Sequence, residues 1–154
     1  MRLVLGIIFL ILSTFFGYKF SSKFSDRRVF YNDFYLFNKQ LVNEVFFSQN
    51  SIVNLVDKKT DDGYFIGQVK KIILEKNNKI QLSNTYTKEE NDFFNDYLSN
   101  IGNGDSLSQR KYLEGIDELL KEKRQITQDE EKKYKKLYVK LGFLFGLVLL
   151  IIVL

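Results

Sequence analysis

The sequence predicts an all-α protein: a small helical bundle between an N-terminal and a C-terminal transmembrane helix, with the last soluble helix continuing into the C-terminal span. Two uncharged apolar runs, residues 3–18 and 141–154, stand at the ends of the chain. Between them, apolar residues recur every three or four positions, the period of an amphipathic helix. No proline interrupts residues 106–154. We expect an anchor at 1–20, a bundle at 21–140 and a second anchor at 141–154.

The two apolar runs are short for membrane spans. As helices, 16 and 14 residues extend about 24 and 21 Å, against a hydrocarbon core roughly 30 Å thick. Both can span if the ammonium groups of Lys19 and Lys140 reach the headgroups and neighbouring apolar residues lengthen the column. A buried core helix is the alternative for the second run, but that run is apolar all round.

The N-terminal run also has features of a secretory signal, because Arg2 precedes ten apolar residues. However, residues 13–18 offer no pair of small residues at the spacing of a cleavage site, and the basic residues that follow oppose export. We therefore expect an uncleaved anchor.

Basic residues are concentrated on the inner flank of each run, and they are Lys19, Lys23, Arg27, Arg28, Lys132, Lys133, Lys135, Lys136 and Lys140. The positive-inside rule then predicts a two-pass protein of the cell membrane with its soluble body in the cytoplasm. The net charge is +4, yet residues 29–131 carry 13 Lys and Arg against 18 Asp and Glu. The basic flanks therefore indicate contact with membrane lipid and not with nucleic acid.

The chain contains neither cysteine nor histidine. This excludes disulfides, the usual zinc sites and the Ser-His-Asp and Cys-His catalytic systems. We expect no enzyme, no cofactor, no metal and no small-molecule substrate. An enzyme that depends on carboxylates, lysines, hydroxyls or tyrosines remains an alternative.

The first helix of the body carries an aromatic stripe, made by Phe30, Phe34, Phe37, Leu41 and Val45 with Tyr31, Tyr35, Val42 and Phe46 beside it. Such a stripe could stack bases, but acidic residues interleave it, so a bundle core is the better interpretation. A short helix at 51–59 and another at 65–77 follow, separated by a turn at Asp61, Asp62 and Gly63. Residues 72–74 and 80–82 could instead form two short strands around Asn77 and Asn78.

Thr87 and Glu90 have the spacing of a capping box, which begins a helix with Phe93, Phe94, Tyr97, Leu98 and Ile101 on its buried face. Residues 102–104 end that helix, because glycine and asparagine tolerate the left-handed conformation. Ser106 and Gln109 repeat the capping arrangement. The last helix then carries a stripe of Tyr112, Leu113, Ile116, Leu119 and Leu120, a polar stretch after Lys121, and the C-terminal span.

Gly142 and Gly146 form a small-xxx-small pair, which lets another helix approach closely. Such pairs also arise by chance. The nearest candidate for the packing partner is the first anchor, with Gly6 and Ser13. The glycines of residues 102–105 have only a superficial likeness to a phosphate-binding loop, because they follow a helix and no Lys-Ser or Lys-Thr comes after them.

The whole plan resembles the stage III sporulation protein AB family of endospore-forming bacteria. The similarity covers nearly the full chain and includes residues 44–47, residues 101–105 with Gln109, and residues 138–147. The chain departs from the family in lacking prolines at 48–51 and in a shorter linker at 77–87.

The resemblance implies a non-enzymatic membrane platform component of the sporulation channel, with a body similar to the cytoplasmic domains of type II secretion platform proteins. Its partners would be other proteins of the same operon, including an ATPase, and its body would lie on the mother-cell side. Asp105, Gln109 and Glu44 are the candidate partner contacts, although Asp105 could instead only stabilise a helix start. The alternative function is a membrane-tethered regulator or sensor that binds a soluble partner.

Overall fold

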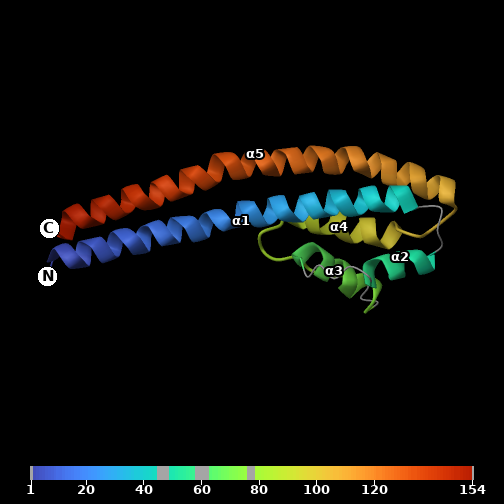
Figure 1. Cartoon of the computed structure of the whole chain (residues 1–154), viewed down its shortest axis with the longest axis horizontal. Coiled ribbons are helices and arrows are strands. Elements are labelled where there is room, and N and C mark those ends of the chain that lie inside the picture. The colour runs from blue at the N-terminus through green and yellow to red at the C-terminus, as the bar shows by residue number, and fades with distance from the viewer. Residues whose placement is uncertain (1, 45–48, 58–62, 76–78, 154) are drawn as a thin grey trace. The chain divides into compact units, whose positions relative to one another are not determined.

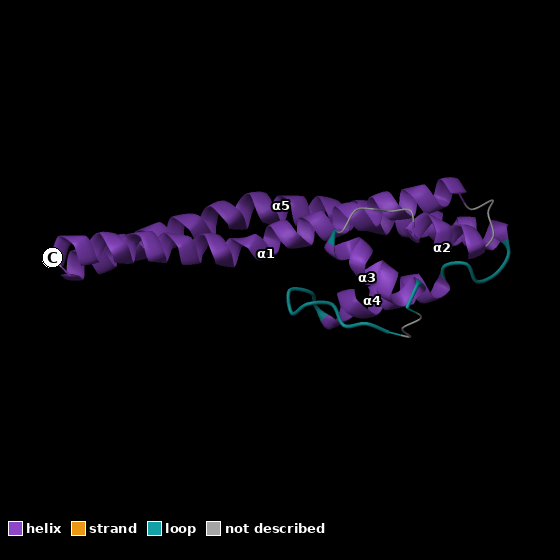
Figure 2. Cartoon of the chain, turned by 60° about the horizontal axis from the view of Figure 1, so that its bottom comes forward, coloured by secondary structure: helices purple, strands orange, loops and turns teal. Residues whose placement is uncertain are grey.

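The structure is a computed structural model that describes residues 2–44, 49–57, 63–75 and 79–153 (Figure 1). Its elements are α1 (Arg2–Glu44), α2 (Gln49–Asp57), α3 (Tyr64–Ile73), α4 (Lys88–Asn100) and α5 (Ser106–Val153). Helices account for 88% of the described residues, and no strand occurs among them (Figure 2). The predicted all-α class is confirmed.

The chain divides into two compact units. We call residues 1–29 and 125–154 the terminal unit, and residues 30–124 the bundle unit. Both α1 and α5 contribute residues to each unit. Residues 21–29 and 125–140, which the sequence predicts as part of the bundle, belong to the terminal unit.

The two long helices are uninterrupted. The sequence predicts the N-terminal anchor and the aromatic helix as separate elements, whereas α1 runs through both over 43 residues. The physical reason is that residues 18–44 contain neither glycine nor proline, the residues least favourable in a helix interior. The helix α5 extends over 48 residues, so the predicted continuity of the last soluble helix with the C-terminal apolar run is confirmed.

Aromatic rings fill the core of the bundle unit. The predicted stripe of α1 is buried, since Phe30, Phe34, Phe37 and Leu41 are each at most 3% exposed. The ring of Phe34 lies 4.7 Å from that of Tyr97 and 5.2 Å from that of Phe65, measured between ring centres. These rings therefore pack against protein and are not available to stack bases. Val45 and Phe46 lie outside the described residues.

Polar side chains inside this core are paired. The Tyr97 hydroxyl donates to Oδ1 of Asn38 at 3.1 Å, and Nδ2 of Asn38 donates to the carbonyl oxygen of Leu113 at 3.0 Å. The Tyr31 hydroxyl donates to Glu90 at 2.9 Å. Burial raises the pKa of Tyr97 well above its ordinary value of 10.0, so its hydroxyl remains a donor. These bonds connect α1 to α4 and α5.

The segment between α3 and α4 settles the choice between helix and strands. Residues 64–73 form α3, which confirms the helical interpretation, and residues 79–83 are irregular, so the paired strands are wrong. Side-chain amides of α4 pair with this backbone in place of a second strand. Asn95 accepts from the N–H of Ile80 at 3.0 Å and donates to its carbonyl at 2.9 Å, and Asn91 accepts from the N–H of Leu82 at 2.8 Å. The predicted turns at Asp61–Asp62 and Asn77–Asn78 lie outside the described residues.

Helix α4 begins as predicted. Its capping box is confirmed, because the N–H of Glu90 donates to the Thr87 hydroxyl at 3.2 Å and the N–H of Thr87 donates to the Glu90 carboxylate at 2.9 Å.

One member of the apolar stripe predicted on the last helix does not face the core, since Leu119 is 45% exposed while Leu120 is fully buried. Neighbouring residues project about 100° apart on a helix, so only one of the two faces the core.

Candidate functional site

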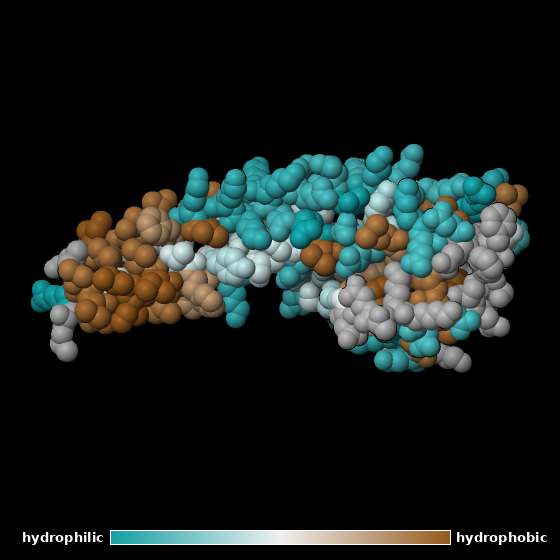
Figure 3. All heavy atoms as spheres, viewed as in Figure 1, coloured by the Kyte–Doolittle hydropathy of each residue, from teal (hydrophilic) through white to brown (hydrophobic). Residues whose placement is uncertain are grey.

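Helices α1 and α5 lie antiparallel within the terminal unit. The contacts between the two helices include Gly6 with Leu150, Leu10 with Gly146, Ser13 with Gly142, and Phe24 with Tyr134, so residue numbers fall along α5 as they rise along α1. Among the described residues, α1 and α5 are the two helices long and apolar enough to cross a membrane, and only 6% of the most apolar window of each is buried. Apolar residues cover the terminal ends of both helices in Figure 3. Neither apolar run is therefore a buried core helix.

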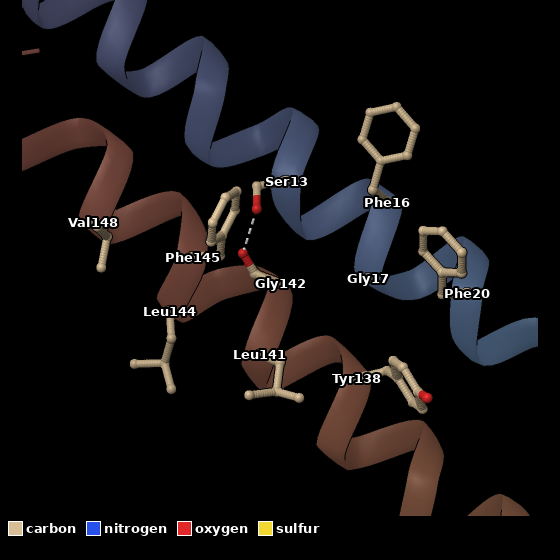
Figure 4. Close-up of a pocket in the computed structure, with 10 residues that line it drawn as sticks. All are labelled: Ser13, Phe16, Gly17, Phe20, Tyr138, Leu141, Gly142, Leu144, Phe145 and Val148. Carbon is tan, nitrogen blue, oxygen red and sulfur yellow. Dashed lines mark hydrogen bonds between the residues drawn. The ribbon is translucent and has the colours of Figure 1, made fainter. Parts of the chain in front are cut away.

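Glycines let the two backbones approach closely. A Cβ on Gly142 would lie 2.8 Å from the carbonyl oxygen of Ser13, and a Cβ on Gly146 would lie 2.9 Å from the Cα of Leu10. Real Cβ contacts are longer than this, so both positions require glycine for this spacing. The Ser13 hydroxyl donates to the carbonyl oxygen of Gly142 at 2.6 Å, as Figure 4 shows.

Sequence reasoning identified Gly142, Gly146 and Ser13 but missed Gly17. A Cβ on Gly17 would lie 2.6 Å from the carbonyl oxygen of Tyr138. The signal was present in the sequence, because Ser13 and Gly17 are themselves a small-xxx-small pair. The structure thus brings together one such pair from each helix.

An ion-pair cluster lies next to the apolar stretch in the same unit. Arg28 pairs with Glu131 at 2.5 Å and Arg27 with Glu130 at 3.3 Å. The Ser25 hydroxyl donates to Glu131 at 2.6 Å, and the Lys135 ammonium donates to Ser25 at 3.1 Å.

The Ser25 hydrogen bond, with the nearby Arg28 guanidinium, lowers the pKa of Glu131 below its ordinary value. Sequence reasoning assigned the basic residues to topology and lipid contact, and it missed these partners. No local pattern reveals them, because the paired residues are about a hundred positions apart in the chain.

The candidate partner residues of the bundle unit lie in the turn between α4 and α5. Gly102 and Gly104 have φ of 78° and 103°, the left-handed region that the sequence predicted for the end of α4. Gln109 holds this turn together with its side-chain amide. It accepts from the N–H of Gly102 at 3.1 Å and donates to the carbonyl oxygens of Asn100, at 3.0 Å, and Asn103.

The capping arrangement predicted for Ser106 and Gln109 is wrong. The residue that caps α5 is Asp105, whose carboxylate accepts from the N–H of Ser108 at 2.7 Å and from its hydroxyl at 3.1 Å. These hydrogen bonds lower the pKa of Asp105 below its ordinary value of 3.8. Gln109 is not free to complete a capping box, because its amide bonds to the preceding turn. Both residues therefore have local structural roles.

Sequence reasoning missed the exposed apolar side chain in this turn. Leu107 is 65% exposed, directly after the start of α5. It stands six residues before Leu113, about 240° around the helix, so it lies off the buried stripe. The sequence signal for it was an apolar residue that lies off the buried stripe and beside a helix cap.

The third candidate contact, Glu44, is the last residue of α1. Its side chain lies outside the described part of the chain.

The model of one protein family, stage III sporulation protein AB, matches residues 66–154, more than half of the chain. The turn of residues 101–109 and the closing segment of residues 138–147 lie inside the match, and residues 44–47 lie before it. No curated protein and no solved structure gives a match. The chain therefore belongs to the stage III sporulation protein AB family, and its role is in sporulation.

Proposed function

We propose that the chain is a non-enzymatic platform component of the channel complex between mother cell and forespore. In this proposal α1 and α5 cross the cell membrane as a hairpin, and the bundle unit lies in the cytoplasm of the mother cell. There it receives an ATPase and other proteins of the channel, as in secretion systems. The observation that carries the proposal is the antiparallel pairing of α1 with α5.

The pairing supports the hairpin because it aligns the two basic flanks. Phe24 and Tyr134 stack with ring centres 5.0 Å apart, and Arg27 and Arg28 pair with Glu130 and Glu131. Helices joined in this way place both flanks on the same side of a membrane. Since positively charged flanks stay in the cytoplasm, that side is the cytoplasmic one.

The absence of cysteine from the natural chain makes this topology directly testable. Single cysteines replace Arg2, next to the N-terminus, and Ser99, on an exposed position of α4. In intact cells, a membrane-impermeant maleimide should label Arg2→Cys and should label Ser99→Cys only after permeabilisation. Labelling of both, or of neither, in intact cells would exclude the hairpin.

The docking surface that we propose is the α4–α5 turn with Leu107 at its centre. Its polar residues already bond to the turn itself, so the turn is held in one conformation before any partner binds. Leu107 is an exposed apolar residue of the type found at the buried centre of protein interfaces, where charged residues are depleted. Around it Asp105 and Ser108 supply a polar rim.

A photo-crosslinking amino acid at Leu107 tests this surface in sporulating cells. Leu119, on the same helix and 45% exposed, is the matched control position. We expect Leu107 to capture the ATPase or a channel subunit and Leu119 to capture neither. Recovery of an unrelated soluble signalling protein at Leu107 would favour the regulator or sensor, and equal capture at both positions would remove this surface.

Two substitutions of Asp105 separate partner binding from helix capping. Asparagine caps helices as well as aspartate does, and alanine does not. If the charge contacts a partner, Asp105→Asn should lose the crosslinked partner while it keeps the thermal stability of the natural chain. If Asp105 only caps α5, Asp105→Asn should behave as the natural chain and Asp105→Ala should lower the melting temperature.

A further inference from the structure

A shallow groove runs along one side of the helix pair in the terminal unit. Its volume is about 580 Å³. Lining residues from α1 and α5 are shown in Figure 4, where Phe20 and Tyr138 stand at one end and Val148 at the other. Apart from Ser13 and the Tyr138 hydroxyl, the lining side chains are apolar, and the hydroxyl of Ser13 is already bonded to Gly142.

We propose that this groove binds one acyl chain of an anionic phospholipid from the cytoplasmic leaflet, with the phosphate at Lys23. The proposal goes beyond the platform function, because it concerns the anchor and requires no protein partner. Three features of the groove support it: its length, its position and the charge at its mouth.

The groove has the length of one leaflet. The ten helical steps from Tyr138 to Val148 correspond to about 15 Å along a helix, half of a hydrocarbon core roughly 30 Å thick. On α1 the lining residues, 13–20, are the half of the apolar run that adjoins the basic flank. An acyl chain that enters from the cytoplasmic leaflet needs a groove along this half of the span only.

The mouth of the groove is cationic. The Lys23 ammonium lies 5.7 Å from the ring centre of Tyr138, which lines the groove, and 5.1 Å from that of Phe24. Arg27 and Arg28 pair with glutamates, but Lys23 has no carboxylate partner within the described part of the chain. Its charge is therefore available to a phosphate. Lys19 and Lys140 directly adjoin the lining residues Phe20 and Leu141 in sequence and add to the positive potential.

Native mass spectrometry of the full chain in detergent tests the proposal with phosphatidylglycerol, which is anionic, and phosphatidylcholine, which is not. We expect one retained phosphatidylglycerol in preference to phosphatidylcholine. Lys23→Gln should weaken that retention about fivefold, the loss expected for one lysine close to an anionic membrane surface. The matched control is Lys132→Gln, which removes the same charge from a side chain that is 76% exposed, and it should change retention little.

A second pair of variants examines the groove itself. Leu144→Trp places a large ring among the lining residues, and Ile151→Trp places one outside them, at a position 70% exposed. Only Leu144→Trp should reduce retention. A phosphatidylglycerol with a photoreactive acyl chain, in vesicles of phosphatidylcholine that hold the chain, should label Leu141 and Phe145 more than Ile151.

Several outcomes would overturn the proposal. Equal retention of the two lipids, equal effects of Lys23→Gln and Lys132→Gln, or uniform photolabelling would mean that the helices carry only ordinary surrounding lipid. A dimer that Leu144→Trp abolishes would mean that a second copy fills the groove. These measurements use no channel protein, so their failure and the failure of the platform function can be told apart.

Discussion

The Ser13 hydroxyl donates a hydrogen bond of 2.6 Å to the carbonyl oxygen of Gly142, 129 positions away in the chain. This contact requires that the two helix backbones lie close together, and the glycines at positions 17 and 142 permit this. A Cβ added to either glycine would lie only 3.1 Å from the Cα of the other. The apolar halves of α1 and α5 thus form a specific pair and are not two independent anchors.

Enlarging Gly142 should separate this pair. We expect Gly142→Leu to destabilise the helix pair by about 1–3 kcal/mol, the usual cost of forcing extra atoms into a packed contact. A reporter is available, because a Cβ added to Gly6 would lie 3.7 Å from the Cβ of Leu150, within the range of roughly 3.5–4.5 Å for a disulfide. In the variant carrying Gly6→Cys and Leu150→Cys, mild oxidation should form the bond, and Gly142→Leu should reduce its yield.

The matched control for this experiment is Gly115, on the same helix α5, where an added Cβ meets nothing within 4 Å. Gly115→Ala should leave the disulfide yield unchanged and stabilise the helix by up to about 1 kcal/mol. If Gly142→Leu and Gly115→Ala gave the same yield, the glycines would have no part in the pairing.

Removing the Ser13 hydroxyl should weaken the same pair by a smaller amount. Interhelical hydrogen bonds in membranes contribute about 0.6 kcal/mol on average and up to roughly 1.7. Ser13→Ala should therefore lower the disulfide yield slightly, as measured by the ratio of oxidised to reduced chain at a fixed redox potential. Thr14→Ala is the control, because the Thr14 hydroxyl bonds at 2.8 Å to Leu10 of its own helix. A larger effect of Thr14→Ala would contradict the assignment.

Local patterns in the sequence predicted much of this fold. The Phe30 to Leu41 stripe and the capping box of Thr87 and Glu90 depend on residues three or four positions apart, and the structure has both. The family resemblance likewise rested partly on a local segment, the turn of residues 101–105 with Gln109, which lies within the matched region.

Contacts between distant residues could not be predicted in this way. The side chain of Asn95 bonds to the backbone of Ile80, where a neighbouring strand would otherwise do so, and Glu130 pairs with Arg27. Neither the spacing nor the type of Asn95 and Glu130 predicts these contacts. Asparagine and glutamate are common on exposed helix faces, so only the packed structure shows which of them bind. The same holds for Asp105, since the spacing predicts Ser106 as the cap of α5 and the structure has the cap one position earlier.

A third prediction concerns the buried hydrogen bond from the Tyr97 hydroxyl to Asn38. Tyr97→Phe removes the donor to Asn38 and leaves a buried acceptor without its partner, which should lower the free energy of unfolding by about 1–3 kcal/mol. The measurement is denaturant unfolding of the full chain in detergent, followed by circular dichroism. Tyr35→Phe is the control, since the Tyr35 hydroxyl has no hydrogen bond among the described residues. Equal losses in the two variants would show that the Tyr97 hydroxyl contributes nothing.

The carboxylate of Glu131 should make the helix pair sensitive to acid. Its pKa in the folded chain is below the ordinary value of 4.5, because Ser25 and Arg28 stabilise the ionised form. Since folding favours the ionised carboxylate, its contribution is complete above the unfolded pKa and disappears as the pH falls through the folded pKa. Glu131→Gln should cost about 2 kcal/mol near neutral pH, a typical value for hydrogen bonds to a charged group.

Comparison of the natural chain with Glu131→Gln in detergent, from about pH 6 to about pH 3, isolates this group from the other carboxylates. The difference in free energy of unfolding should shrink as the pH falls, because protonation removes from the natural chain what the substitution has already removed from the variant. Glu114→Gln is the control: Glu114 pairs with Arg110 at 2.8 Å, but its side chain is 49% exposed, and such pairs contribute about 0.5 kcal/mol or less. A difference for Glu131→Gln that stayed constant down to the lowest pH would mean that the shape of the side chain, and not its charge, holds α1 to α5.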